Sequence, residues 1–307
     1  MTLETRPDTI SASEDFKRLV SRHKRRLLVD KIVKGLVLCA LLLVLIPLGD
    51  LMYLFIYKGA TLISWQTLTS SVSTNASSFV SGGLANYILG TLLLVGLSAA
   101  FAVPLGVLGG IYLAEFADGN RHSRIIRFMS DVLAGVPSIV LGYAGYLLFT
   151  QTTPKLFGWG FSALAGGIAL SVLMLPYVLR TTELSINRVP LSIREAAIAL
   201  GSNRTKMVNR ITFRLALPGI LTGIIISLGI AFGETAPLLY TAGFGNYIPQ
   251  QLIGQPIGYL TYVIFYFTQL PSQSAINLSY EASFLLILII VAFNMVARIG
   301  LRRFSKI

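Results

Sequence analysis

The sequence predicts an all-α integral membrane protein with six transmembrane helices. Charged residues make up 12% of the 307 residues and hydrophobic residues 54%, whereas a soluble domain carries about 25% charged residues. Six stretches are apolar over the roughly 20 residues that a helix needs to cross the hydrocarbon core. We place the six spans at residues 35–57, 84–114, 125–150, 160–179, 215–242 and 281–300.

The first span follows a basic segment, residues 1–34, which we expect to lie along anionic lipid headgroups. The first thirty residues are polar and charged, and no small-residue cleavage site accompanies the first apolar run. We therefore expect the first span to remain as a membrane anchor. It holds the single cysteine, Cys39, so no internal disulfide is predicted.

The second span is longer than a bilayer requires, which predicts a tilt or a kink at Pro104. Glycines with the G-x-x-x-G spacing that allows close helix packing occur in the second and fifth spans. These glycines are Gly106 and Gly110, and Gly219 and Gly223.

Two further stretches are expected on the external side. Residues 70–83 are rich in Ser, Thr and Asn and predict a loop. Residues 253–270 are apolar enough to be taken for a seventh span, but their aromatic residues favour an external re-entrant or interfacial helix. Asp50 and Glu281 are expected to be interfacial caps at the outer ends of the first and last spans.

The lysines and arginines predict the orientation of the spans. Nine precede the first span, three follow the second, seven lie in and around the loop after the fourth, and four are C-terminal. The remaining two are Lys58 and Lys155, on the other side. Because such residues concentrate in cytoplasmic loops, we expect a multi-pass inner-membrane protein with both termini cytoplasmic. Residues 35–303 would form a single transmembrane domain, with a short tail at 304–307.

Composition also argues against several classes of function. A net charge of +12 could indicate nucleic-acid binding, but its distribution on one side of a membrane does not, and no nucleic-acid partner is expected. His23 and His122 lie far apart without other ligands, so no metal site is predicted. The chain has no G-x-x-x-x-G-K-[ST] motif and no evident nucleophile–base pair, so we expect neither catalytic residues nor a bound cofactor.

The loop between the fourth and fifth spans, about residues 188–214, predicts a helix–turn–helix. Ser192 and Glu195 have the spacing of a capping box at the start of a helix. One apolar face follows at helical spacing, formed by Ile193, Ala196, Ala197 and Leu200.

The turn within this loop is also predicted by its residues. Gly201 suits a left-handed C-terminal cap, and Ser202-Asn203 can start a second helix. A two-turn helix is marginal by itself, so it must pack on a surface, either its own bundle or a partner.

Two acidic residues in apolar spans are candidates for a translocation path, because a charge in the hydrocarbon region usually faces a cavity or a partner. Asp131 follows Arg127 at the i+4 position, where an interfacial ion pair is the alternative. Glu234 and Thr235 lie in the fifth span.

The residues around Glu234 predict an interrupted helix, with a structural helix–helix contact as the alternative. Gly229 and Gly233 allow close helix approach, and Pro237 removes a backbone donor, so these three residues are candidate hinges. Interrupted helices of this kind form midplane sites in transporters.

Five further segments form a set with this loop: GGLAN at 82–86, GIYLAE at 110–115, PSIV at 137–140, RTTE at 180–183 and GETAPLL at 233–239. Together with Glu195-Ala196-Ala197, Gly201 and Ile211, they resemble the PstA-type permeases of phosphate importers. The loop resembles the EAA motif of the wider binding-protein-dependent transport permease family.

The resemblance implies a type I ABC importer permease for inorganic phosphate. The loop helix would be a coupling helix that docks into an ATPase subunit, through Ser192, Glu195, Ala196, Ala197, Leu200 and Gly201. The implied partners are two copies of a cytoplasmic PstB-type ATPase, a second PstC-type permease that shares the pore, and a PstS-type external phosphate-binding protein.

This sequence departs from the family pattern at two places. Ile211-Thr212-Phe213-Arg214 replaces the family's I-x-L-P, with a proline only at Pro218. Ile230 occupies a position where the family carries an arginine, so any cation for phosphate would come from a partner. Glu234 could accept a hydrogen bond from a protonated phosphate.

Other functions stay open at this point. One is an ABC importer of another oxyanion or solute. Another is a secondary transporter or channel that works without ATP. A membrane enzyme is the weakest alternative.

Overall fold

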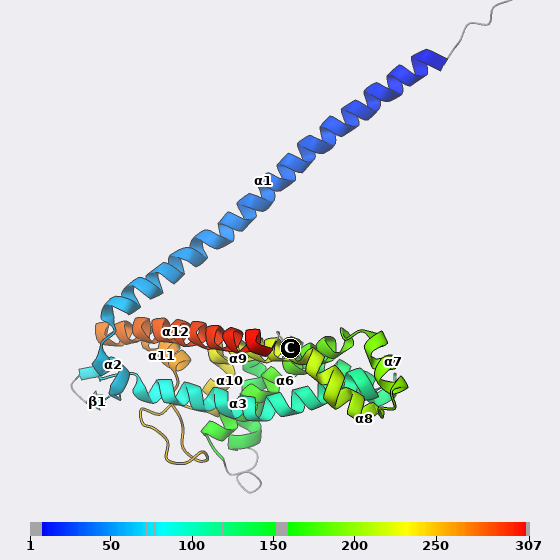
Figure 1. Ribbon diagram of the computed structural model, residues 1–307. Helices are drawn as coiled ribbons and strands as arrows, with labels where there is room; N and C mark the ends of the chain where they lie inside the picture. The colour runs from blue at the N-terminus through cyan, green and yellow to red at the C-terminus, as the bar shows by residue number, and fades with distance from the viewer. Residues whose placement is uncertain (1–7, 72, 76–77, 118, 152–158, 305–307) are drawn as a thin grey trace, which may run out of the picture. The chain divides into compact units, whose positions relative to one another are not determined.

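The computed structural model describes residues 8–71, 73–75, 78–117, 119–151 and 159–304 (Figure 1). The chain divides into two units, Met1–Ile56 and Tyr57–Ile307. Lys155 and nearly all of the predicted C-terminal tail lie outside the described residues.

The first unit consists of helix α1 (Asp8–Leu62), whose last residues belong to the second unit. The helix runs through Pro47 and contains the predicted first span. Its residues Val29–Leu62 are long and apolar enough to cross a membrane.

The second unit is a helical bundle with one short β-hairpin. The hairpin pairs β1 (Ser73–Asn75) with β2 (Ser78–Ser81), antiparallel, inside the predicted external loop. The helices, in chain order, are α2 (Trp65–Thr69), α3 (Ala85–Ile111), η1 (Tyr112–Phe116), α4 (Arg121–Gly135), α5 (Ser138–Tyr146), η2 (Leu147–Gln151), α6 (Ala163–Asn187), α7 (Leu191–Ala199), α8 (Arg204–Met207), η3 (Val208–Thr212), α9 (Phe213–Gly233), α10 (Ala236–Thr241), α11 (Leu260–Phe267) and α12 (Gln273–Phe304).

Helix α6 forms the centre of this unit. Of its most apolar stretch 67% is buried, against 33% for α3 with η1 and 39% for the α8–α9 stretch. Glycines let α3 and α9 approach it: a Cβ at Gly110 would lie 2.6 Å from Thr182 Cβ, and one at Gly223 would lie 2.0 Å from Thr181 Oγ1. The predicted close packing at these two glycine pairs is thereby confirmed.

The third span is not the continuous helix that hydropathy predicts. Helices α4 and α5 meet at an angle of 101°, with the break at Val136 and Pro137. Proline disfavours helical backbone in the residue before it, and Val136 accordingly has extended dihedral angles. Pro104, in contrast, lies inside the unbroken α3. Five described helices are long and apolar enough to span a membrane, and the bent pair makes six.

The suspected seventh span contains only the eight-residue α11, which is too short to cross a bilayer. Its residues Leu260, Val263 and Phe267 are buried against the bundle. The prediction for Glu281 was wrong: it lies about two turns inside α12 and is 7% exposed.

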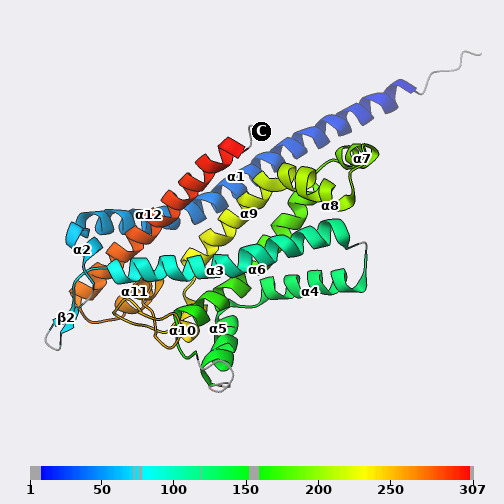
Figure 2. The same cartoon turned by 60° about the horizontal axis from the view of Figure 1, so that its bottom comes forward.

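The second unit places its loops at two opposite ends (Figures 1 and 2). Helices α7 and α8 lie at one end, together with η1 and the start of α4. Helix α2, the hairpin and α11 lie toward the other end. The loops predicted to be cytoplasmic in this unit are therefore grouped at one end.

Candidate functional site

The loop between α6 and α9 carries the first candidate site, a short helix at the surface. Helix α7 begins at Leu191 with Pro190 as its N-cap. The predicted capping box was therefore wrong, because Pro190 starts the helix early and places Ser192 within the first turn. Ser192 and Glu195 are both exposed.

The turn after α7 matches its prediction. Gly201 has a φ of +83°, a conformation that glycine adopts without steric cost. The Gly201 N–H donates to Ile198 O at 2.9 Å and the Ser202 N–H to Ala197 O at 3.1 Å, which is a Schellman motif. Asn203 then caps α8 through its side chain, which accepts from the Lys206 N–H at 2.8 Å. Helix α8 continues through η3 into α9.

Most apolar side chains of α7 point away from the described protein. Ala197 is buried against Met207 and Val208. Of the other residues on the predicted apolar face, Ile193 and Ala196 are exposed and Leu200 is 88% exposed. Ile198, outside that face, is 54% exposed. Clustered exposed apolar side chains often belong to interaction surfaces. We name this surface the docking patch: Leu191, Ile193, Ile198 and Leu200.

Two ion pairs with buried carboxylates connect helices at the end of the bundle that carries α7. Arg194 of α7 lies 2.9 Å from the Glu115 carboxylate, and their side chains are 14% and 3% exposed. Arg127 donates to the Glu183 carboxylate at 2.7 Å. The predicted pair of Arg127 with Asp131 is therefore replaced by a pair with Glu183, and Asp131 is exposed.

These ion pairs were missed from the sequence. The signal was present, because Glu115 ends a long apolar span and Glu183 ends another, each within a segment of the PstA-type set. Their partners come from distant segments, so spacing along one helix could not identify them.

The second candidate site is a break in the fifth span. Helix α9 ends at Gly233, Glu234 has extended backbone angles, and α10 begins at Ala236 with Pro237 in its first turn. The interruption predicted from Pro237 is confirmed, and Thr235 is the residue that caps α10.

A cavity of about 190 Å³ lies beside this break. Glu234 lines it together with Ser138 and Tyr177. Ser138 starts α5, directly after the break in the third span. The two interrupted helices also touch, since a Cβ at Gly142 would lie 2.6 Å from Pro237 Cα.

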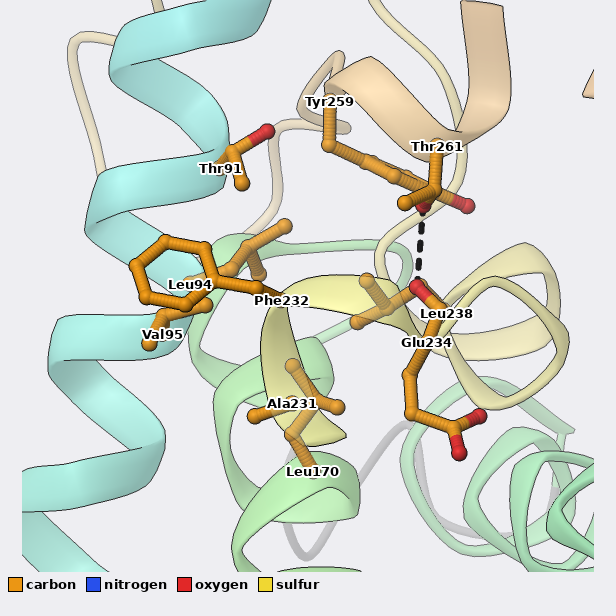
Figure 3. Close-up of a pocket in the computed structure, with 10 residues that line it drawn as sticks. All are labelled: Thr91, Leu94, Val95, Leu170, Ala231, Phe232, Glu234, Leu238, Tyr259 and Thr261. Atoms are coloured by element: carbon orange, nitrogen blue, oxygen red, sulfur yellow. Dashed lines mark hydrogen bonds between the residues drawn. The ribbon is translucent and has the colours of Figure 1, made fainter. Parts of the chain in front are cut away.

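Helix α11 supports the break from the other side. The Thr261 hydroxyl donates to the Glu234 carbonyl oxygen at 2.9 Å (Figure 3). A small cavity between them is lined by Thr91, Tyr259 and Thr261, and the Glu234 carboxylate points away from Thr91 and Tyr259.

The candidate hinge glycines do not lie at helix contacts within the described chain. A Cβ at Gly229 or Gly233 would meet no atom within 4 Å, so their predicted close approach is not made inside this unit. Among the described residues no group of three His, Cys, Asp or Glu could hold a metal ion.

Residues 106–306 match the family described as the binding-protein-dependent transport system inner membrane component. The chain belongs to this family. The matched residues include α6, both interrupted helices, and the loop between α6 and α9, which we call the docking loop.

Relatives of this family support the same assignment over nearly the whole chain. A Mycobacterium bovis protein named phosphate transport system permease protein PstA 2 is 41% identical over 276 residues, covering 90% of this chain and 88% of the relative. A Yersinia pestis protein named phosphate transport system permease protein PstA is 34% identical over 294 residues, covering 95% of this chain and 97% of the relative.

Solved structures of ABC transporters share the fold. A bacterial alginate ABC transporter in complex with a pentasaccharide-bound periplasmic protein matches with a TM-score of 0.64 at 16% identity, covering 94% of this chain and 99% of that one. The inward-facing MetNI methionine transporter matches with a TM-score of 0.58 at 18% identity, covering 72% and 95%.

Proposed function

We propose that this chain is a permease subunit of an ATP-driven importer of inorganic phosphate, without catalysis of its own. The observation that carries the proposal is the match to PstA permeases along the whole bundle, at 34% identity over 95% of the chain for the Yersinia pestis relative. An importer of another oxyanion is the alternative, and no specific observation favours it.

The proposed complex has the composition implied by the family resemblance. Two copies of a PstB-type ATPase hydrolyse ATP, and one of them receives the docking patch of this chain. A second, PstC-type permease completes the pore, and a PstS-type binding protein delivers phosphate from outside. The exposed Leu200 and Ile198 support the ATPase contact, because a helix of two turns needs a partner surface for its apolar side chains.

The proposed orientation puts the docking loop and both termini in the cytoplasm, in the inner membrane of a bacterium. The grouping of η1, α7, α8 and the start of α4 at one end of the second unit supports it. Arginines and lysines of these elements would then all face the cytoplasm, as the asymmetry of charge requires.

The proposed path for phosphate passes the two interrupted helices. Glu234 is an acceptor, so it can bind phosphate only through a proton that phosphate itself carries. None of the described residues that line the cavity beside Glu234 is a lysine or arginine. The attraction for the anion is therefore assigned to the second permease, and Glu234, Thr235 and Ser138 would orient the protonated oxygen. Asp131 would lie nearer the cytoplasmic end of the same path.

The test is reconstitution of the complex that copurifies with this chain from membranes. We expect an ATPase and a second permease in the purified material, and ATP-dependent uptake of labelled phosphate into proteoliposomes when binding protein is present. Uptake that persists without ATP, or that prefers sulfate over phosphate, would contradict the proposal.

A further inference from the structure

The π-helical segment η1, which ends the second span, binds arginines from three other elements. Arg194 of α7 pairs with the Glu115 side chain at 2.9 Å. Arg204 of α8 donates to the Glu115 carbonyl, and Arg127 of α4 donates to the Leu113 carbonyl at 3.0 Å. The docking loop and the third span are therefore both attached to η1.

The chemistry of a helix end explains this convergence. The last carbonyl groups of a helix have no partner within it and carry partial negative charge, which favours bound cations. π-Helical turns of this kind occur frequently at functional sites. Glu115 adds a full charge, and its side chain is 3% exposed. Solvent ions screen such a buried pair much less than an exposed one.

Arg194 also connects α7, the docking helix, to the fourth span. It donates to the carbonyl oxygen of Ile186, in the last turn of α6. Its neighbour in the sequence is Glu195 of the docking helix. A displacement of α7 therefore acts through one side chain on the ends of both α3 and α6.

We propose that the Glu115–Arg194 pair transmits movement of α7 to the second and fourth spans. Glu115 and Arg194 are proposed as positioning residues, because each acts through the elements that the pair connects. This inference rests on the proposed function, since it requires an ATPase to move α7.

A role in stability alone makes a different prediction. Removing one partner of a buried pair leaves an uncompensated charge and is strongly destabilising, whereas replacing both partners is often neutral. A stabilising pair would change the amount of assembled complex and leave the phosphate imported per ATP unchanged. If the pair transmits movement, its removal should lower the phosphate imported per ATP.

The experiment uses the purified complex in proteoliposomes and measures phosphate uptake and ATP hydrolysis together. The variants are Glu115→Gln, Arg194→Gln, the double variant Glu115→Gln/Arg194→Gln, and the charge swap Glu115→Arg/Arg194→Glu. Arg210→Gln is the control, because Arg210 is an exposed arginine of the same loop. Coupling between sites typically amounts to about 5–150-fold, so we expect phosphate imported per ATP to fall about tenfold in the double variant.

The outcomes separate the inference from the proposed function. The charge swap restores the ion pair but not the hydrogen bond to the Ile186 carbonyl, so it should recover the ratio only in part, and Arg210→Gln should leave it unchanged. If single variants fail to assemble, the double variant decides, because it buries no lone charge. A normal ratio in the double variant overturns the inference that the pair transmits movement. Uptake by the unmodified complex still supports the proposed function as an importer. No phosphate uptake by the unmodified complex overturns the proposed function instead.

Discussion

The hydroxyl of Thr261 donates a hydrogen bond to the carbonyl oxygen of Glu234, across a break in the fifth span. Glu234 lies beyond the last residue of α9, so this carbonyl accepts from a side chain of another helix. A short helix far along the sequence thus holds the backbone that presents the Glu234 carboxylate.

Replacing Thr261 with valine should shift Glu234 without changing the shape of α11. A buried acceptor that loses its donor costs about 1–3 kcal/mol, so we expect phosphate uptake to fall severalfold while the complex still assembles. The measurement is initial uptake against phosphate concentration. Thr261→Ser, which keeps the hydroxyl, should behave like the unmodified protein, and equal loss in both variants would contradict the role of this hydrogen bond.

Glu234→Gln tests the acceptor in the proposed path. A glutamine side chain offers a donor as well as an acceptor, so the requirement for a proton on the substrate is relaxed. We expect phosphate uptake to decrease at least tenfold and inhibition by sulfate to increase. The control is Asp50→Asn, which removes an exposed carboxylate from the first span. Unchanged uptake and unchanged sulfate inhibition in Glu234→Gln would remove this residue from the path.

Gly201→Val tests the turn after the docking helix. Valine at a φ of +83° costs about 1–2 kcal/mol, because its Cβ crowds the neighbouring carbonyl. The Schellman turn should open and α7 should lose its fixed direction. ATP hydrolysis should then continue with little phosphate import. Gly201→Asn is the matched control, since asparagine tolerates this conformation better than valine, and its phosphate-to-ATP ratio should lie close to normal.

Leu200→Asp tests the docking patch. The side chain is 88% exposed, so the substitution should leave the folding of this chain unchanged and reduce the amount of ATPase that copurifies. Leu200→Met keeps the apolar contact and should retain the ATPase. Full ATPase recovery with Leu200→Asp would show that the patch contributes nothing to the interface.

Two glycines of the fifth span should respond oppositely to alanine. A Cβ at Gly223 would lie 2.0 Å from Thr181 Oγ1, whereas one at Gly229 would meet nothing within 4 Å in this unit. Replacing glycine with alanine inside a helix stabilises the helix by about 1 kcal/mol at either position. At Gly223 the steric overlap of the new Cβ with Thr181 should cost more than this gain. We expect a lower thermal midpoint for Gly223→Ala in detergent and no decrease for Gly229→Ala. Equal midpoints would refute this packing.

The sequence predicted well those features that depend on neighbouring residues. The left-handed Gly201 and the break before Pro237 follow from backbone chemistry that acts over one or two positions. The capping box failed for the same reason, because Pro190 sets the start of α7 more strongly than Ser192 can. Pro137 was overlooked because hydropathy continues unchanged across it.

The contacts between distant segments could not be predicted in this way. Arg127 has a carboxylate four residues away at Asp131, yet it pairs with Glu183. The choice depends on how α4 approaches α6, which no local pattern encodes. Glu115, in contrast, has no lysine or arginine within four residues in the sequence. Only the folded loop between α6 and α9 brings Arg194 to it.

The contact between Gly142 and Pro237 has a consequence for chimaeric permeases. The two residues belong to α5 and α10, which lie far apart in the sequence but leave no space for a side chain at position 142. A segment of α5 taken from a relative with a larger residue there would collide with the backbone of α10. Grafting one of these half-helices between permeases therefore requires grafting the other from the same donor.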